Sequence, residues 1–414
     1  MGSKGIEKNW VIMTEKRSIY ATEQEWNLAR KIMQQKMASG ETPPFKIQND
    51  NQQLNHSFLV AKGENDQPIL GVLARSRDQA EGILGFGSFG MCKLIVWEDG
   101  TKNAVKIEAE KNDQNEIAIM TKLGLIRALF KRSWEKRLAE HPNKTQVNEQ
   151  WISKSAIRNK IYKIMPLIEG IDINKYLSSV YLPKPFVGSL VIFSSIVDKL
   201  IEIHAQNILH NDLHPGNVLV DANLNAYIID NGKSIDVEHK PITVKDNFNC
   251  LGQIARLAPE LMAFRNKTLA DRAKDPSSVM NTTEMPFSTA SDVFALSFIF
   301  SQLFYPLLTE QALQELMSGM READPNKRIS LQKISAMIKS TDFIEKMRSY
   351  DQNSNFEGPA LEENYTEQTD NSENATSDSL SYSSDETNQH QTEFSGYDES
   401  ISSDKAKPNN KLKT

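Results

Sequence analysis

The sequence has little cysteine and no long apolar segment. Its 414 residues include two cysteines, Cys92 and Cys250, too few for the disulfide framework of many small secreted domains. The longest apolar stretches, such as residues 293–303, are too short to span a bilayer and are typical of a buried helix. No segment resembles a signal peptide. These absences favour a reducing compartment, and we expect a cytoplasmic protein with no transmembrane segment.

Acidic charge is concentrated at the C-terminal end. The formal net charge is −6, and residues 351–414 alone carry 14 acidic and 4 basic side chains. This segment is also rich in Ser, Asn and Thr and poor in aliphatic residues, so it cannot bury enough apolar surface to fold. We therefore predict a disordered acidic tail over residues 351–414, after a slightly basic body.

Residues 1–80 are predicted to form an N-terminal extension with one helix and two strands. Residues 57–61 and 69–73 are short apolar runs typical of strands. Residues 23–37 have apolar side chains at helical spacing, namely Trp26, Ala29, Ile32 and Met33. Beyond the extension, β-type patterns come first and long apolar helical patterns dominate after residue 187. The sequence therefore predicts an α+β fold with a β-rich first lobe and a helical second lobe.

A glycine-rich segment lies between two predicted strands. Residues 85–90 read Gly-Phe-Gly-Ser-Phe-Gly, and glycine lets backbone N–H groups approach a phosphate closely. A dinucleotide-binding loop of similar pattern opens a helix, whereas β-type residues follow here. We therefore interpret the segment as a phosphate-covering loop in a hairpin, with Gly85, Gly87, Ser88 and Gly90 as candidate nucleotide contacts.

Lys106 lies inside a short apolar strand, residues 104–107. A buried lysine is unfavourable unless it is paired, so Lys106 requires a phosphate or a carboxylate nearby. Glu116, in the predicted helix 115–123, is the best partner in the sequence. The alternative is an edge-strand lysine whose amine reaches solvent.

Three polar residues form a pattern that phosphoryl transfer requires. Asp212 and Asn217 lie in the segment His-Asn-Asp-Leu-His-Pro-Gly-Asn, and Asp230 follows thirteen residues after Asn217. One carboxylate can accept a hydroxyl proton, while an amide and a second carboxylate can hold Mg²⁺ against nucleotide phosphates. Residues 218–220 and 226–229 are predicted strands of a hairpin that returns Asp230 to Asn217.

Residues 83–350 resemble a eukaryotic-type protein kinase, because the landmarks of that family occur in order. These landmarks are the glycine loop, Lys106, Glu116, residues 210–217, Asp230, Ala-Pro-Glu at 258–260, Asp292 and Arg328. The resemblance implies the bilobal protein-kinase fold. Its N-lobe would comprise residues 81–165 and its C-lobe residues 166–350.

The resemblance also implies roles for the site residues. Asp212 would accept the proton of the substrate hydroxyl, and Asn217 and Asp230 would bind Mg²⁺. Lys106, held by Glu116, would neutralise the phosphates of ATP. Further nucleotide contacts implied by the family are Cys92, Ala104, the gatekeeper Met165, Leu167 of the hinge, Asp172 and Leu219. Glu260 and Arg328 are expected to form a buried structural ion pair, and His210 is expected to be structural.

The chain departs from the family pattern around the catalytic loop. Asn211 replaces an arginine that in many kinases binds a phosphorylated activation loop, which argues against activation of that kind. His214 replaces the lysine with which Ser/Thr kinases contact phosphate, so the acceptor type stays open. Asn231 replaces an apolar Phe. Gln253 and Arg256 replace the usual Thr and Tyr before Ala-Pro-Glu.

Two insertions are predicted, one near residues 266–285 and a helical one near 125–160. Residues 127–163 hold 10 basic and 3 acidic side chains, which suits a solvated helix face or a site for a phosphate-rich ligand or an acidic partner. The helical prediction depends on an apolar stripe of Leu125, Ile126, Leu129, Phe130, Trp134 and Leu138.

The predicted function is an ATP- and Mg²⁺-dependent protein kinase with protein substrates, Ser/Thr acceptors favoured, and no nucleic-acid partner. A small-molecule kinase of the aminoglycoside or choline type is an alternative, because residues 210–217 resemble that family too. A pseudokinase scaffold is another. The Lys106–Glu116 spacing is similar to that of casein-kinase-1-like enzymes. The insertions and acidic tail resemble effector kinases that intracellular bacteria secrete into the host-cell cytosol.

Overall fold

The computed structural model describes most of the chain outside the two terminal segments. The described residues are 21–48, 54–63, 65–75, 82–87, 90–110, 114–133, 159–178, 186–238, 256–274 and 286–353. The predicted acidic tail beyond residue 353 therefore lies outside them, as does most of the predicted insertion at 125–160.

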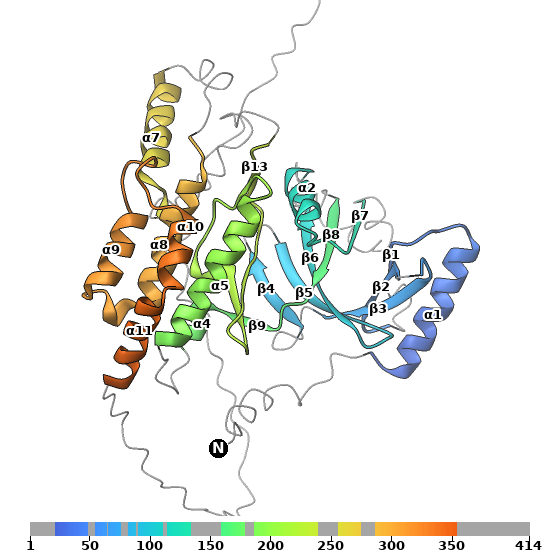
Figure 1. The fold of residues 1–414 in the computed structure, drawn as a ribbon. Helices are drawn as coiled ribbons and strands as arrows, with labels where there is room; N and C mark the ends of the chain where they lie inside the picture. The colour runs from blue at the N-terminus through green and yellow to red at the C-terminus, as the bar shows by residue number, and fades with distance from the viewer. Residues whose placement is uncertain are drawn as a thin grey trace, which may run out of the picture. The chain divides into compact units, whose positions relative to one another are not determined.

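The N-terminal part of the described chain is one antiparallel sheet of eight strands (Figure 1). Its hydrogen-bonded order is β1-β2-β3-β5-β6-β8-β7, and β4 pairs with β5 off this path. The strands are β1 (Phe45–Ile47), β2 (Ser57–Lys62), β3 (Pro68–Leu73), β4 (Ile83–Gly87), β5 (Gly90–Trp97), β6 (Lys102–Ala109), β7 (Ala128–Arg132) and β8 (Lys160–Pro166). The strands expected around residues 57–61, 69–73 and 104–107 are thus confirmed.

Strand β5 pairs with two strands along the same edge. Its first half pairs with β4, and its second half, residues 95–97, pairs with β3. A Cβ atom on Gly71 of β3 would lie 2.6 Å from Cε3 of Trp97, so only glycine fits between these strands. The N-terminal extension is therefore joined to the glycine-rich hairpin through one shared strand.

Helix α1 (Glu23–Ala38) covers one face of this extension (Figure 1). The Thr22 side chain accepts the backbone N–H of Glu25, and the Glu25 carboxylate accepts that of Thr22, a capping box. Ala29 and Met33 of this helix are buried, and Trp26 packs edge-on against Phe58. The amphipathic helix predicted over residues 23–37 is confirmed.

Residues 128–132 form strand β7, so the helical prediction for this stretch is wrong. β7 pairs with β8 along its whole length, and the Phe130 ring stacks on Tyr162 with 4.4 Å between ring centroids. A short apolar run fits helical spacing and strand alternation about equally well, and backbone pairing with β8 decides the outcome. Trp134 and Leu138, which completed the predicted stripe, lie outside the described residues.

The sheet is curled, so that side chains at or next to its first strand, β1, contact side chains of the last two strands in its order, β8 and β7. The Arg132 guanidinium of β7 donates a hydrogen bond to the side-chain oxygen of Gln48, which follows β1. The Lys46 amine of β1 lies 5.7 Å from the Tyr162 ring centroid. The apolar side chains inside this curl form one cluster of Leu59, Ala61, Leu73, Ile95, Trp97, Val105, Phe130, Tyr162 and Ile164.

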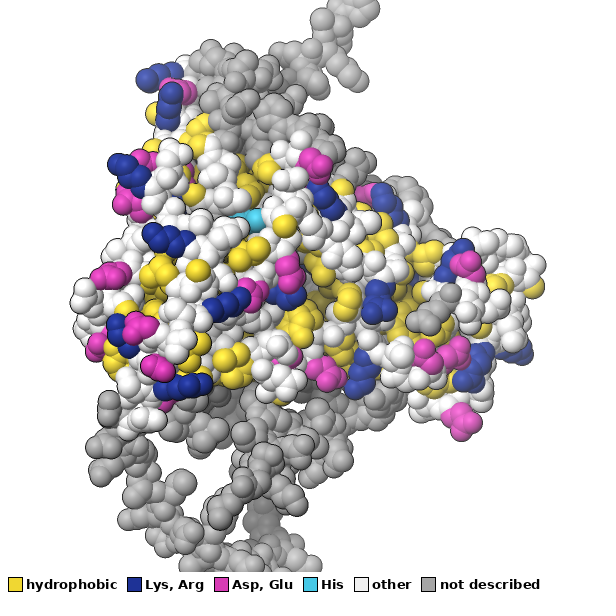
Figure 2. All heavy atoms as spheres, in the orientation of Figure 1, with side chains coloured by type: hydrophobic (Ala, Val, Ile, Leu, Met, Phe, Trp, Pro, Cys, Tyr) yellow, Lys and Arg dark blue, Asp and Glu magenta, His cyan; other side chains and the backbone are white. Residues whose placement is uncertain are grey.

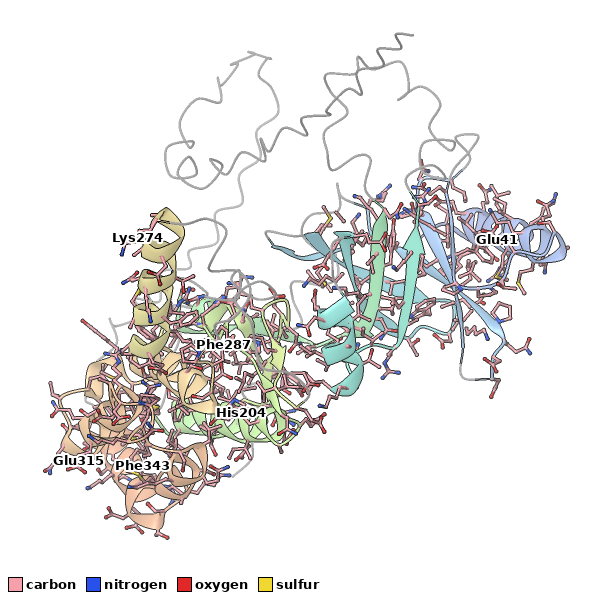
Figure 3. All side chains as sticks on the ribbon, turned by 90° about the horizontal axis from the view of Figure 1, so that it is seen from above. Glu41, His204, Lys274, Phe287, Glu315 and Phe343 are labelled. Atoms are coloured by element: carbon pink, nitrogen blue, oxygen red, sulfur yellow. The ribbon has the colours of Figure 1, made fainter. Side chains whose placement is uncertain are left out.

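Helices dominate after β8, which confirms the predicted α+β order. Helix α2 (Gln114–Lys122) precedes β7, and the later helices are α4 (Ile173–Ser178), α5 (Phe186–His204), α7 (Pro259–Lys274), α8 (Thr289–Leu303), α9 (Gln311–Met320), α10 (Leu331–Ile338) and α11 (Thr341–Asn353). Figure 3 labels His204 at the end of α5, Lys274 at the end of α7, Glu315 in α9 and Phe343 in α11. None of the described helices is long and apolar enough to cross a membrane.

The helical part has its own core, centred on α5 and α8. Phe193 of α5 packs edge-on against Phe300 of α8 with 5.0 Å between ring centroids, and both side chains are fully buried. Two small sheets connect this core to the loops that follow. β9 (Gly170–Asp172), β11 (Val218–Asp221) and β12 (Ala226–Ile228) form one, and β10 (Ile208–Leu209) and β13 (Ile235–Asp236) form the other.

Candidate active site

Asp292 of α8 fixes the loop that carries Asp212 and Asn217. Asp292 is fully buried, and its carboxylate accepts the backbone N–H groups of His210 and Asn211, each at 2.8 Å. The same carboxylate lies 2.9 Å from Nε2 of His204. Burial opposes its charged form, but these donors outweigh it and lower the pKa of Asp292. We call Asp292, His204 and the two bonded amides the Asp292 cluster.

Asp212 and Asn217 contact each other within this loop. The Asn217 side-chain amide donates to the backbone oxygen of Asp212 at 3.0 Å and lies 3.5 Å from its Oδ2. The other carboxylate oxygen, Oδ1, is 2.9 Å from the amine of Lys233. The prediction did not include Lys233. It lies just after Asp230-Asn231-Gly232, where nothing in the local pattern points back to Asp212.

The predicted hairpin returns Asp230 to the same place. β11 and β12 pair in register, and the backbone N–H of Ile229 donates to the Asn217 carbonyl oxygen at 2.9 Å. Asp230 has a φ of +64°, a conformation that an ordinary side chain rarely adopts. Its Oδ1 lies 3.0 Å from the Lys106 amine. Burial opposes ionisation, but the Lys106 charge outweighs it and lowers the pKa of Asp230.

Lys106 of β6 is surrounded by carboxylates. Its amine lies 3.0 Å from Oε1 of Glu116, the predicted partner in α2, and 2.8 Å from Oε1 of Glu108. Burial favours the neutral amine, but Asp230, Glu116 and Glu108 together raise the pKa of Lys106 well above its usual range. The alternative of a solvent-facing edge lysine is excluded, because β6 lies between β5 and β8.

A second lysine, Lys163 of β8, completes this group of charges. Its amine lies 2.7 Å from Oε2 of Glu108 and 2.6 Å from Oε2 of Glu116, and its side chain is 0% exposed. Each glutamate therefore bridges both lysines, and we call Lys106, Glu108, Lys163 and Glu116 the charge ring. The prediction missed Lys163, although the argument used for Lys106 applies: a lysine inside an apolar strand needs a carboxylate.

The predicted nucleotide contacts lie on neighbouring strands. Cys92 is paired with Lys106, and Ala104 with Met165. Leu219 is paired with Asp172 across β11 and β9. Burial raises the pKa of the Cys92 thiol to about 11, in keeping with a packing role.

Gly90, Gly85, Gly87 and Leu167 behave differently from one another. A Cβ on Gly90 would lie 2.3 Å from the carbonyl oxygen of Ile107. Strand packing alone therefore requires this glycine, whether or not a nucleotide binds there. A Cβ on Gly85 would meet nothing within 4 Å. Gly87 ends β4, and Ser88 lies outside the described residues. The Leu167 side chain packs into the apolar cluster under α1, which leaves only its backbone for a hinge role.

His210 and His214 have structural contacts. His210 is fully buried, and its Nε2 lies 3.2 Å from the carbonyl oxygen of Ile229. Nδ1 of His214 accepts the backbone N–H of Gly216 at 3.1 Å and so caps the turn before Asn217. Burial, joined by the Arg256 charge, lowers the pKa of His214. His214, which stands where Ser/Thr kinases have a lysine, is therefore a neutral ring at neutral pH.

The ion pair predicted between Glu260 and Arg328 is confirmed. Two guanidinium nitrogens contact the two carboxylate oxygens at 2.8 and 2.9 Å. Arg328 also donates to backbone oxygens, including that of Ala290 at 2.8 Å. This bidentate arrangement joins the start of α7 to the start of α8. Asn231, in place of an apolar Phe, is buried, and its Oδ1 accepts the Ser234 hydroxyl at 3.3 Å.

Asn217 and Asp230 suit a Mg²⁺ ion that a nucleotide completes. In the described part of the chain, no group of three or more His, Cys, Asp or Glu side chains could hold a metal ion unaided. Mg²⁺ commonly takes only one or two protein carboxylates, together with substrate phosphates and water. The lowered pKa of Asp230 keeps this carboxylate ionised, as a hard cation requires. The donor set therefore fits the ion that the sequence predicts.

Comparison with known proteins gives a consistent result. Residues 79–339 match the family described as "Protein kinase domain". The serine/threonine-protein kinase cds1 of Schizosaccharomyces pombe is 26% identical over 270 residues, which cover 60% of this chain and 55% of that protein. CBL-interacting protein kinase 15 of Oryza sativa is 25% identical over 272 residues, or 64% of this chain and 59% of that protein. The serine/threonine-protein kinase AtPK2/AtPK19 of Arabidopsis thaliana is 23% identical over 265 residues, which cover 62% of this chain and 54% of that protein. The chain thus spans little more than half the length of these relatives.

Proposed function

Because the chain belongs to the protein kinase domain family, we propose that it transfers the γ-phosphoryl group of ATP to protein hydroxyls. One observation carries the proposal: Asp212, Asn217, Asp230 and Lys106 are linked by consecutive contacts. Asn217 bonds to Asp212, Ile229 bonds to Asn217, and Asp230 pairs with Lys106. In the proposed reaction these residues would serve as a proton acceptor, two ligands for a hard cation and a phosphate-binding amine.

In this proposal the residues have separate roles. The acceptor oxygen bonds to phosphorus as the bond to the β-phosphate oxygen breaks, and Asp212 takes the proton of the acceptor hydroxyl. Asn217 and Asp230 hold Mg²⁺, which supplies charge stabilisation for the phosphates when bound. Lys106 contacts the phosphates from the sheet side. The Lys233 amine, 2.9 Å from Oδ1 of Asp212, would hold this carboxylate in place.

We propose Ser and Thr as the acceptors. The support is similarity to relatives whose names describe serine/threonine-protein kinases. Phosphoamino-acid analysis of labelled protein separates the possibilities, since phosphotyrosine as the sole product would contradict this part of the proposal.

The central test is phosphotransfer by the purified protein. Wild type and Asp230→Ala are incubated with radiolabelled ATP, Mg²⁺ and generic protein acceptors, and Asp198→Ala serves as the control. Among the described residues, Asp198 forms its ion pair with the exposed Lys339. Label transferred by wild type and Asp198→Ala but not by Asp230→Ala supports the proposal. Equal labelling by Asp230→Ala would contradict it.

The two alternatives make different predictions in the same assay. A small-molecule kinase would label an aminoglycoside or choline and no protein. A scaffold would bind nucleotide weakly or not at all and would label nothing. The paired Glu260 and Arg328, at landmarks of the protein-kinase pattern, favour the protein kinase.

The finer assignments stay predictions. They are the casein-kinase-1-like branch, secretion into a host cytosol and the phosphate-rich or acidic partner of residues 127–163. In the described part of that segment, Lys131 contacts Glu110 and Arg132 contacts Gln48. On the face shown in Figure 2, basic and acidic side chains are interspersed. Charge reversal at Lys131, Arg132, Lys136 and Arg137 with unchanged ligand binding and activity would remove the partner hypothesis.

A further inference from the structure

The charge ring contains one more buried cation than nucleotide binding requires. Lys106 is 18% exposed and lies beside Asp230, whereas Lys163 is 0% exposed and its amine pairs with Oε2 of Glu108 and Oε2 of Glu116. Its full burial excludes direct contact with a phosphate. Its function must therefore be exerted through the two glutamates.

The charges in the ring balance only when Lys163 is present. Two lysines face two glutamates, and Asp230 adds a further negative charge at the Lys106 side. Without Lys163, the single ammonium group of Lys106 would face both glutamates of the ring as well as Asp230, so the excess of negative charge would rise from one to two. Charges in a low-dielectric interior act strongly on one another, so Lys106 would be held among the carboxylates, and their uncompensated charge would repel an incoming polyphosphate.

We propose that Lys163 is a positioning residue that neutralises Glu108 and Glu116 and thereby releases Lys106 for the nucleotide. The proposal rests on the function above, because it assigns Lys106 to the phosphates of ATP. Lys163 also holds Glu116 through Oε2 while Oε1 serves Lys106. Helix α2 therefore stays attached to the sheet when Lys106 turns toward a ligand.

A purely structural role for Lys163 makes a different prediction. If the side chain only filled space, its replacement would weaken nucleotide binding through distortion, and removing a carboxylate elsewhere in the ring would not repair it. If the charge of Lys163 is what matters, neutralising Glu108 in the Lys163 variant should restore nucleotide binding. The remaining pair, Lys106 and Glu116, is then balanced in charge again.

The experiment measures nucleotide affinity by calorimetry with a non-hydrolysable ATP analogue and Mg²⁺. We expect Lys163→Met to bind at least about tenfold more weakly than wild type, because a buried charge loses its partner. The double variant Lys163→Met/Glu108→Gln should recover affinity to within about threefold of wild type, as the pairwise coupling of neighbouring charges requires. Lys163→Arg should retain most of it.

Control variants separate this effect from general damage. Lys93→Met removes a different lysine of the sheet, which is half-buried and whose amine donates to the Ala74 carbonyl oxygen, and should leave affinity unchanged. Circular dichroism and the melting temperature report folding for each variant. If Lys163→Met does not fold, the double variant carries the test, since its ring is charge-balanced and should fold and bind.

Three outcomes overturn the inference. They are wild-type affinity in Lys163→Met, no recovery in the folded double variant, and equal loss in Lys93→Met. Phosphotransfer is scored separately. A wild type that binds the analogue but transfers no phosphate refutes the proposed activity and leaves the role of Lys163 standing, whereas a wild type that binds no nucleotide refutes both.

Discussion

The charge ring and the Asp292 cluster both bury carboxylates, but they differ in what donates to them. In the ring the donors found among the described residues are amines of long side chains, Lys106 and Lys163. In the cluster two of the donors are backbone N–H groups of the catalytic loop. A backbone donor cannot turn away without moving the chain, whereas a lysine amine can change partners by rotating its side chain.

This difference assigns separate tasks to the two parts of the site. The cluster fixes the loop that carries Asp212 and Asn217, and in the proposed reaction such pre-organisation would lower the barrier of transfer. The ring holds Lys106 in a setting from which it can move to a phosphate. The variants below test the contrast, from the largest expected effect on stability to the smallest.

Removal of the central carboxylate should damage the protein most. In Asp292→Ala, two backbone N–H groups and His204 lose their buried acceptor, and we expect a loss of about 3–5 kcal/mol in unfolding free energy. Urea denaturation measures it. Asp198→Ala, which breaks only an exposed pair, should change stability by about 0.5 kcal/mol or less. Similar small losses in both variants would show that the cluster does not fix the loop.

Removal of Lys106 should separate activity from stability. In Lys106→Met, Lys163 still pairs with both glutamates, so we expect less than half the stability loss of Asp292→Ala. Phosphotransfer should nevertheless be abolished, because the phosphates lose their amine. Parallel urea titrations and labelling assays measure the two quantities. A stability loss equal to that of Asp292→Ala would contradict the idea that the ring is adaptable.

Lys233 combines the two designs, since a side-chain donor contacts the fixed loop. Lys233→Met should lower kcat by about tenfold or more while the KM for ATP stays near wild type. Steady-state kinetics provide both values. Adding His214→Lys, which returns a lysine to the catalytic loop, should recover part of the loss, and Lys199→Met on the surface should have no effect. An unchanged kcat in Lys233→Met would exclude a catalytic contribution.

The smallest effect concerns acid sensitivity of the fixed loop. Burial lowers the pKa of His214, so the unfolded chain binds this proton more readily than the folded chain. The contribution of His214 to stability therefore falls as the pH drops below its unfolded pKa of about 6.5, and is unaffected above it. Melting temperatures from pH 8 to pH 5 should diverge, with His214→Gln losing less than wild type. Parallel curves would refute this assignment.

The sequence was sufficient for the contacts that depend on short spacings or on a family pattern. The α1 helix, the hairpin that returns Asp230 to Asn217, and the pairs Lys106–Glu116 and Glu260–Arg328 all formed as expected. A local period or a turn signal predicted the helix and the hairpin, whereas the family pattern predicted the two ion pairs.

The failures have one physical cause, which is pairing between strands that lie far apart in the sequence. Residues 128–132 became a strand because β8 offered backbone partners. Lys163 and Glu108 are 55 residues apart and meet only because β6 and β8 are neighbours. Lys233 meets Asp212 only after the hairpin has reversed the chain. No window of local sequence contains these partners together.

The shared strand β5 has a practical consequence for any shortened form of the protein. A chain cut to residues 79–339, the span of the family match, would lose α1 and β1–β3. Residues 95–97 would then present unpaired backbone groups beside the uncovered Trp97 ring. Such an open apolar edge is a template for pairing with a second chain. We therefore expect the extension to protect this sheet against aggregation, and a shortened form that stays in solution should begin near residue 21.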